Sequence, residues 1–292
     1  MKATNPSPRR YLHSLLLYAL LLTASVVLIL PLLWLVSTSL KEAGRELSLP
    51  PRFIPQPVVW GNYLELFRRA PFDIFFRNSF LITILSTLGS MLSCSLVGFG
   101  FARLRFRGRN WLFGLVLSTM MLPVIIQLIP QFLLFKQLGW LNTFLPLIVP
   151  SWFAQGSYGH GAFYIFLMRQ FYKTIPLEFD EAARVDGANA FQIYWRVILP
   201  LTIPALVTVG IFAFLAAWSD FLYPLIFLSN KQQFTVALGV RSFMTTGGGQ
   251  AALQWRLLAG ASILSIIPSL IVLLMGQKYF VQGVALSGLS GR

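Results

Sequence analysis

The segment Glu178–Pro200, EFDEAARVDGANAFQIYWRVILP, differs in composition from the apolar chain around it. Four of the nine acidic residues of the protein lie between Glu178 and Asp186. Glu178, Asp180 and Glu181 would occupy the first turn of a helix, where carboxylates are stabilised by the positive end of the helix dipole. The segment is therefore expected to be exposed to water.

Two short helices separated by a glycine are predicted within this segment. Gly187 can adopt the left-handed conformation that ends a helix, and Asn189 is a favourable N-cap for the next one. Pro200 limits the second helix, because proline lacks a backbone N–H group. Asp180 and Arg184 are four positions apart, so we expect them to form an exposed ion pair on the first helix.

The first of these helices has a narrow surface at Ala182 and Ala183, which share a face with Phe179 and Asp186. Small side chains allow another protein to approach a helix backbone closely. Two roles are consistent with this pattern. The segment either docks a partner protein, or it is an amphipathic hairpin that lies at the membrane interface and only stabilises the helix bundle.

The overall composition excludes an ordinary soluble domain. Hydrophobic residues make up 56% of the 292 residues, charged residues make up 11%, and the mean hydropathy is +0.70. Soluble domains carry roughly 25% charged residues, so this chain lacks the polar surface that a soluble fold needs. We expect an all-α integral membrane protein.

Residue types that support catalysis or metal binding are scarce. Cys94 is the sole cysteine, and the two histidines, His13 and His160, are far apart in the sequence. The sequence has no zinc-ligand spacing, no nucleophile–base arrangement and no GxxxxGK[ST] phosphate-binding motif. We therefore expect no catalytic residue, no metal site and no bound cofactor in this chain.

Six membrane spans are predicted in a single domain that covers residues 1–292. The first span is longer than the apolar core of a signal peptide, so we expect it to be retained. The fourth contains a glycine-rich stretch, Gly156–Gly161, which predicts a bend or an interrupted helix. The approximate ranges of the spans are 12–38, 78–102, 111–135, 144–171, 203–228 and 257–280.

The basic residues predict the orientation of these spans. The net charge is +14, and the basic residues lie between apolar spans rather than on one polar domain. They concentrate at both termini and in the second and fourth connections, a pattern typical of cytoplasmic loops rather than of a nucleic-acid-binding surface. We expect a group of four arginines in the second connection to bind lipid phosphates or to set the topology: Arg103, Arg105, Arg107 and Arg109. Both termini of this multi-pass protein are therefore expected in the cytoplasm.

The segment Glu178–Pro200 resembles the EAA loop of ATP-binding cassette importer permeases. Glu181-Ala182-Ala183 is followed after three residues by Gly187, and after nine more by Val197-Ile198-Leu199-Pro200. The spacing is that of the EAA motif, and the residues differ from the motif only at Val197, which replaces isoleucine. Other stretches resemble sugar-importer permeases of the maltose-transporter type, among them LPLLWLVSTSLKE (30–42), GFARLRFRGRNWLF (100–113) and WSDFLYPLIF (218–227).

The resemblance implies a permease of six transmembrane helices in the plasma (inner) membrane of a bacterial or archaeal cell, with cytoplasmic coupling helices in an EAA loop that covers residues 174–200. It implies import of a sugar-like solute that an extracellular solute-binding protein delivers to this chain and a second homologous permease subunit. Two ATPase subunits would bind ATP and Mg²⁺ and would dock on the EAA loops, while membrane lipid surrounds the spans. The residues that the resemblance assigns to ATPase coupling are Glu178, Glu181, Ala182, Ala183, Asp186, Gly187, Leu199 and Pro200.

A candidate solute path lies in the fifth predicted span, at Trp218, Asp220, Phe221 and Tyr223. Aromatic faces and hydrogen-bonding groups are common in clefts that bind sugars, and an acid inside a membrane span often marks a pathway. The alternative is that Asp220 lies near an interface and Trp218 packs between helices. The alternative function is an ion-coupled secondary transporter, which normally carries more charged residues within its spans than this chain does.

Overall fold

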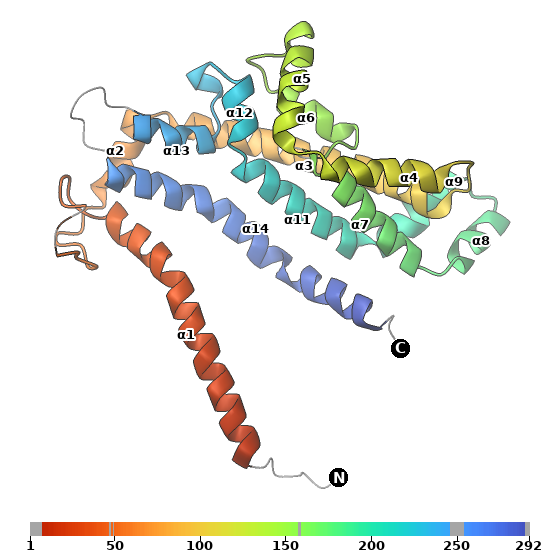
Figure 1. Cartoon of the computed structure of the whole chain (residues 1–292), viewed down its shortest axis with the longest axis horizontal. Coiled ribbons are helices and arrows are strands. Elements are labelled where there is room, and N and C mark those ends of the chain that lie inside the picture. Colours follow the sequence, from red (N-terminus) through yellow and green to blue (C-terminus); the bar gives the residue numbers. More distant parts are fainter. Residues whose placement is uncertain (1–7, 47, 49, 157–158, 246–253, 290–292) are drawn as a thin grey trace. The chain divides into compact units, whose positions relative to one another are not determined.

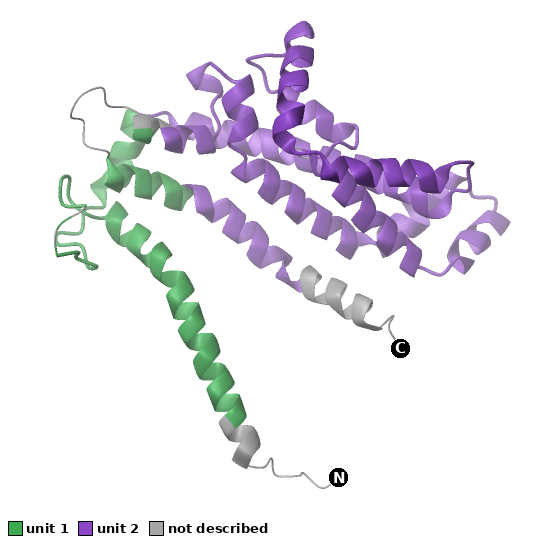
Figure 2. Ribbon diagram, viewed as in Figure 1, with its two compact units in different colours: residues 1–69, 243–264 green, residues 70–242, 265–292 purple. Residues whose placement is uncertain are grey.

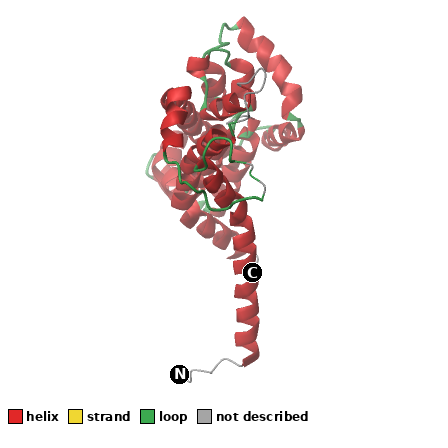
Figure 3. Ribbon diagram, turned by 90° about the vertical axis from the view of Figure 1, so that its left-hand side faces the viewer, coloured by secondary structure: helices red, strands yellow, loops and turns green. Residues whose placement is uncertain are grey.

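A computed structural model describes residues 8–46, 48, 50–156, 159–245 and 254–289. All regular elements among these residues are helices (Figure 3). By its internal contacts the chain divides into two compact units, residues 1–69 with 243–264 and residues 70–242 with 265–292 (Figure 2). The whole of the segment Glu178–Pro200 belongs to the second unit.

The first unit is built from α1 (Pro8–Ser39), α2 (Gly61–Arg69) and the first turns of α14 (Trp255–Leu289) (Figure 1). Helix α1 corresponds to the predicted span 12–38. Every side chain from His13 to Leu33 is exposed. An apolar helix that is uncovered over most of its length is suited to contact with lipid or with another membrane chain, because exposing so much apolar surface to water is unfavourable.

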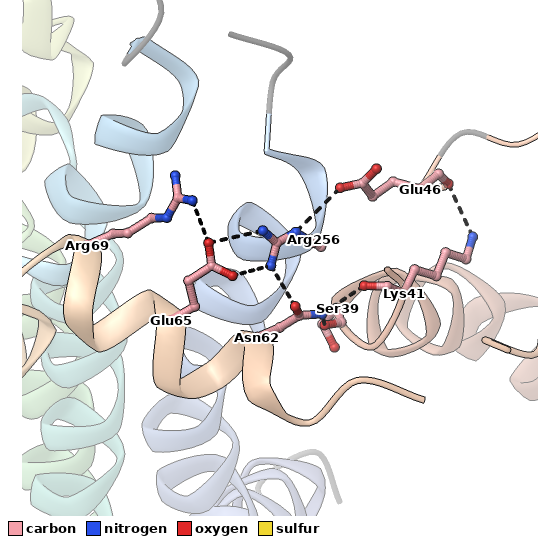
Figure 4. A network of polar contacts seen from close by, with 7 residues as sticks. All are labelled: Ser39, Lys41, Glu46, Asn62, Glu65, Arg69 and Arg256. Atoms are coloured by element: carbon pink, nitrogen blue, oxygen red, sulfur yellow. Dashed lines mark hydrogen bonds and ion pairs between the residues drawn. The ribbon is translucent and has the colours of Figure 1, made fainter. Parts of the chain in front are cut away.

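A polar network fixes the end of α1 to α2 and to the start of α14 within the first unit (Figure 4). The guanidinium of Arg256 donates to both carboxylate oxygens of Glu65, at 2.6 and 3.0 Å, and to Asn62 Oδ1 at 2.6 Å. Asn62 Nδ2 in turn donates to the carbonyls of Ser39 and Lys41, at 2.8 Å each. Two parallel bonds between arginine and carboxylate combine charge with fixed geometry, so they hold the three helices in register.

The hydrogen bonds and charges of this network, together with burial, shift the pKa of two of its members. The hydrogen bond from Arg256, together with the charges of Arg256 and Arg69, lowers the pKa of Glu65. Burial lowers the pKa of Lys41, and the nearby carboxylate of Glu46 opposes this effect. The sequence analysis did not anticipate this network, because its members are separated by up to about 200 positions and belong to connections of mixed charge.

The second unit is organised around α3 (Phe72–Arg103), which packs against α6 (Leu145–Trp152), α7 (Gly161–Thr174) and α11 (Ile203–Ser219). Gly98 lies where α3 meets α7, and a Cβ atom at this position would lie 2.9 Å from Met168 Cβ and 3.2 Å from the carbonyl oxygen of Ile165. The close approach therefore requires glycine. The remaining elements of this unit are α4 (Arg109–Ser118), η1 (Thr119–Met121), α5 (Val124–Gln137), α8 (Glu178–Val185), α9 (Ala190–Gln192), η3 (Ile193–Ile198), α10 (Leu199–Leu201), α12 (Leu222–Phe227), η4 (Lys231–Gln233) and most of α13 (Val236–Thr245).

Helix breaks distinguish the observed elements from the predicted spans. The predicted span 111–135 is split into α4–η1 and α5, which meet at 100° at Pro123. The bend follows from proline, which removes a backbone donor and disfavours a helical residue before it. The predicted span 144–171 is split into α6 and α7, as expected from its glycines. Gly156, between the two helices, has a φ of 68°, in the left-handed region that favours glycine. The predicted span 203–228 is interrupted between α11 and α12 at Asp220.

Three helices in the described part of the chain are each long and apolar enough to cross a membrane. They are α1, α3 and α14, which correspond to the first, second and sixth predicted spans. Up to five spans result if each of two bent helix pairs counts as one. The number of six spans remains a prediction.

Candidate coupling site

The segment Glu178–Pro200 folds as two helical pieces joined at a glycine. Helix α8 covers Glu178–Val185, and Gly187 follows it with a φ of 81°, in the left-handed region. The next helix begins at Asn189, whose Oδ1 accepts from the backbone N–H of Gln192 at 2.9 Å, while Gln192 Oε1 accepts from the N–H of Asn189 at 2.8 Å. This reciprocal capping box and the glycine confirm the predicted helix–glycine–helix arrangement.

The two sides of α8 differ in their surroundings. Asp180 is its one buried residue, and Ala183 on the same side is half-buried. On the other side Phe179 is 47% exposed and Val185 is 88% exposed, with Ala182 exposed between them. These three apolar residues at intervals of three form an outward-facing stripe on a helix that is otherwise acidic. Ala183 lies at the buried edge of the face that it was expected to share with Phe179, Ala182 and Asp186, so it is less exposed than Ala182.

Asp180 forms its ion pair with Arg103 and not with Arg184. Arg103 Nη1 lies 3.1 Å from Asp180 Oδ2, and both side chains are 3% exposed. Arg103 Nη2 also donates to the carbonyls of Tyr172 and Ile175, at 2.6 and 2.7 Å. The prediction of an exposed pair with Arg184 is therefore wrong, because α8 turns Asp180 towards the end of α3 and leaves Arg184 in water.

The second half of the segment is embedded in the core of the second unit. Ile193, Tyr194 and Ile198 are buried and belong to a cluster that includes residues of α3, α7 and α11. The hydroxyl of Tyr194 lies 2.6 Å from Ser95 Oγ, a buried hydrogen bond to α3. Burial raises the pKa of Tyr194, so its hydroxyl remains protonated as a donor or acceptor. Leu199 packs against the same cluster, and Pro200 lies in α10.

A cavity of about 300 Å³ separates α8 from the loop that follows α3. It carries a mixture of charges, because arginines of the loop and acids of α8 face it. Its lining consists of Arg103, Leu104, Arg105, Leu177, Asp180, Glu181 and Arg184. Of the residues predicted to couple to an ATPase, Glu181 lines this cavity, and Glu178, Asp186 and Gly187 are exposed.

The residues of the candidate solute path fall into two groups. Trp218 is 4% exposed, its ring centroid lies 4.8 Å from that of Phe80 with the two rings tilted, and its Nε1 donates to the carbonyl of Ser265 at 2.8 Å. These contacts favour packing between helices as the role of Trp218. Asp220 and Phe221 are half-buried at the break between α11 and α12, where Asp220 Oδ1 accepts from the N–H of Leu222 at 3.1 Å. Tyr223 is 5% exposed and packs in a cluster with residues of α3, α5 and α6.

A sequence profile of the family described as "Binding-protein-dependent transport system inner membrane component" matches residues 94–285. This range includes α8, the glycine turn and all of α11. The chain belongs to this family. It is an inner membrane component of a transport system, a permease subunit and not an enzyme.

Full-length relatives of the permease support this assignment. It is 32% identical over 273 residues to the sn-glycerol-3-phosphate transport system permease protein UgpE of Yersinia pestis, covering 91% of this chain and 94% of that one. It is 32% identical over 256 residues to the arabinooligosaccharides transport system permease protein AraQ of Halalkalibacterium halodurans, covering 87% and 86%. The fold matches a chain of a bacterial ABC transporter involved in the import of alginate, with a TM-score of 0.81 at 23% identity over 95% of this chain and 100% of that one.

Arg103 is the residue of the permease site that the sequence analysis misassigned. It was grouped with Arg105 and Arg107 as a topology and lipid-contact residue, whereas its side chain is buried and those two are exposed. One signal distinguishes it: Arg103 directly follows the apolar residues of the predicted span 78–102 without an intervening polar residue, and it is the last residue of α3, so its side chain is within the packed end of that helix.

Proposed function

We propose that this permease is the membrane-spanning subunit of an ATP-driven solute importer and that α8 docks on the ATPase subunit. The observation that carries the proposal is the two-sided environment of α8. Its inner side is anchored by Asp180, whereas its outer side presents Phe179, Ala182 and Val185 to water. An exposed apolar stripe on a short acidic helix is a feature of a protein interaction surface.

The helix–glycine–helix geometry also supports docking over a purely stabilising hairpin. A hairpin that only stabilised the bundle would turn its apolar residues to the core or to the membrane. Here the second half of the segment supplies the buried residues, Ile193 and Ile198 among them, while the first half leaves its apolar residues uncovered. The second half therefore serves as the attachment and the first half as the contact surface.

The proposed assembly contains a second homologous permease, two ATPase subunits that bind ATP and Mg²⁺, and an extracellular solute-binding protein. A solved structure of similar fold, at 16% identity and a TM-score of 0.66, is described as a bacterial alginate ABC transporter in complex with an alginate pentasaccharide-bound periplasmic protein. The orientation that fits this assembly places α8 and both termini in the cytoplasm, with six spans in all.

The solute class we propose is a sugar or a sugar-like polyhydroxylated compound. The names of similar permeases refer to sn-glycerol-3-phosphate, arabinooligosaccharides and sulfoquinovosyl glycerol, which all carry free hydroxyl groups. Asp220 and Phe221 are the partly exposed members of the candidate path, and we assign solute contact to them rather than to Trp218.

Site-specific crosslinking in membranes tests the docking role of α8. In a Cys94→Ala background, a cysteine at Ala182 should crosslink to the ATPase subunit through a short bifunctional reagent. A cysteine at Ser229, which is exposed and follows α12 in a connection predicted to be extracellular, is the matched control and should not. Absence of a crosslink from position 182, or its modification by a membrane-impermeant reagent added outside the cell, would refute the proposal.

A further inference from the structure

One guanidinium joins three helices at the base of α8. Arg103 is the last residue of α3, and its Nη2 holds the carbonyls of Tyr172 in α7 and of Ile175 just after it. Its Nη1 faces the carboxylate of Asp180 in α8. A planar arginine can satisfy these acceptors at fixed angles, which the single ammonium of a lysine cannot do.

The ion pair is the principal buried attachment of α8 itself. Asp180 is the one buried residue of this helix, and its Oδ2 makes no hydrogen bond to the described residues beyond the contact with Arg103. The space beside the pair is a charged cavity of about 300 Å³ rather than apolar packing. Apart from Ala183, which packs against the core cluster, the ion pair is therefore the buried link between α8 and α3.

The helix that receives this contact lies at the centre of the second unit. Helix α3 packs against α6, α7 and α11, and Gly98, five residues before Arg103, is in close contact with α7. Tightly packed helices move together rather than deform, because interiors are close-packed. A displacement of α8 that is passed to Arg103 would consequently move α3 and the end of α7 as one body.

We propose that Arg103 is a positioning residue that transmits the movement of α8 to α3 and α7. This inference rests on the proposed docking of α8 on the ATPase and adds the route by which force enters the membrane helices. Asp180 is the partner on α8. The exposed apolar stripe makes the docking contact, so docking and transmission reside in different side chains of one short helix.

The test uses the complete transporter in nanodiscs, with ATP and Mg²⁺ as the probe and Cys94→Ala as the background. Spin labels at Leu81→Cys in α3 and Ile129→Cys in α5, both exposed, report the movement of α3 as a change in distance on addition of ATP. A crosslink from Ala182→Cys reports docking separately. The variants are Asp180→Asn, Asp180→Glu and Arg103→Lys, and Arg107→Gln is the control that removes an exposed arginine from the same loop.

We expect Asp180→Asn and Arg103→Lys to keep the crosslink within twofold of the parent protein and to reduce the ATP-induced change in distance at least threefold. Asp180→Glu, which keeps the charge, should restore more than half of the change, and Arg107→Gln should leave it unaltered. Asp180→Asn substitutes only one atom of a buried side chain, so it remains informative if changes at Arg103 prevent folding.

Three results would overturn the inference. The first is a full ATP-induced change in Asp180→Asn with the crosslink intact. The second is loss of the crosslink in that variant, since the pair would then only hold α8 in place for docking. The third is a parent protein whose α3–α5 distance does not respond to ATP. A parent protein without the crosslink would instead refute the docking of α8.

Discussion

Substitution of Gly187 tests whether the turn after α8 needs glycine because of its backbone conformation rather than because of crowding by neighbouring atoms. The residue has a φ of 81°, and a Cβ atom placed on it would meet nothing within 4 Å. The cost of a side chain is therefore backbone strain alone, roughly 1–2 kcal/mol for an ordinary residue in the left-handed region. Because every 1.4 kcal/mol corresponds to a factor of ten, Gly187→Val should reduce the population of the native turn about 5- to 30-fold relative to alternative conformations.

The comparison with Gly187→Asn makes this prediction specific. Asparagine visits the left-handed region far more readily than valine, so it should retain most of the native turn. The assay is recovery of the ATPase subunit with affinity-purified permease, with membrane insertion measured in parallel. We expect normal insertion of both variants, recovery near that of the native protein for Gly187→Asn and at least fivefold lower recovery for Gly187→Val. Equal recovery for the two variants, whether high or low, would refute the argument from backbone strain.

Three further predictions concern stability, measured as the SDS midpoint of unfolding in mixed micelles. Because the pKa of Glu65 is lowered, its pairing with Arg256 stabilises the first unit at pH values above the unfolded-state pKa, near 4.5, and this stabilisation is lost as the pH falls through the lower folded-state pKa. The variant Glu65→Gln should lose this dependence on acid. A pH profile of stability that is the same in the variant and the native protein would contradict the role of the network. Gly98→Leu should destabilise the protein by about 1–3 kcal/mol because α3 and α7 are in contact at this position. Gly100→Leu is the control and should not destabilise the protein, because the space around Gly100 is open. Equal destabilisation by the two substitutions would argue against close packing at Gly98. Tyr194→Phe should cost about 0.5–1.5 kcal/mol through loss of its buried hydrogen bond to α3, and a neutral substitution would show that this bond contributes nothing.

Elements whose structure depends on residues adjacent in the sequence were predicted correctly from local signals. Gly187 and Asn189 fix the turn and the cap by their own conformational and hydrogen-bonding preferences, so the helix–glycine–helix arrangement followed from the segment alone. The long apolar helices α1, α3 and α14 followed from hydropathy in the same way.

Contacts between distant segments were not predictable from such signals. Asp180 has Arg184 as its nearest partner by sequence, yet its partner in the structure is Arg103, 77 positions earlier. The choice depends on which side of α8 faces the bundle, where Ala183 packs against a core cluster built from segments distant in sequence. A kink at Pro123 is expected from proline alone, but its angle of 100° was not predictable, since proline kinks in membrane helices vary with the partners that neighbouring helices provide.

The most direct measurement of the central claim is the reactivity of a cysteine at Val185, the most exposed residue of the apolar stripe on α8. The rate of its modification by a soluble maleimide would be measured in inside-out membrane vesicles, with and without the ATPase subunit. The docking of α8 predicts rapid modification without the ATPase and at least tenfold protection when it is bound, with no protection of a cysteine at Arg107. An equal rate at Val185 in both preparations would contradict the account.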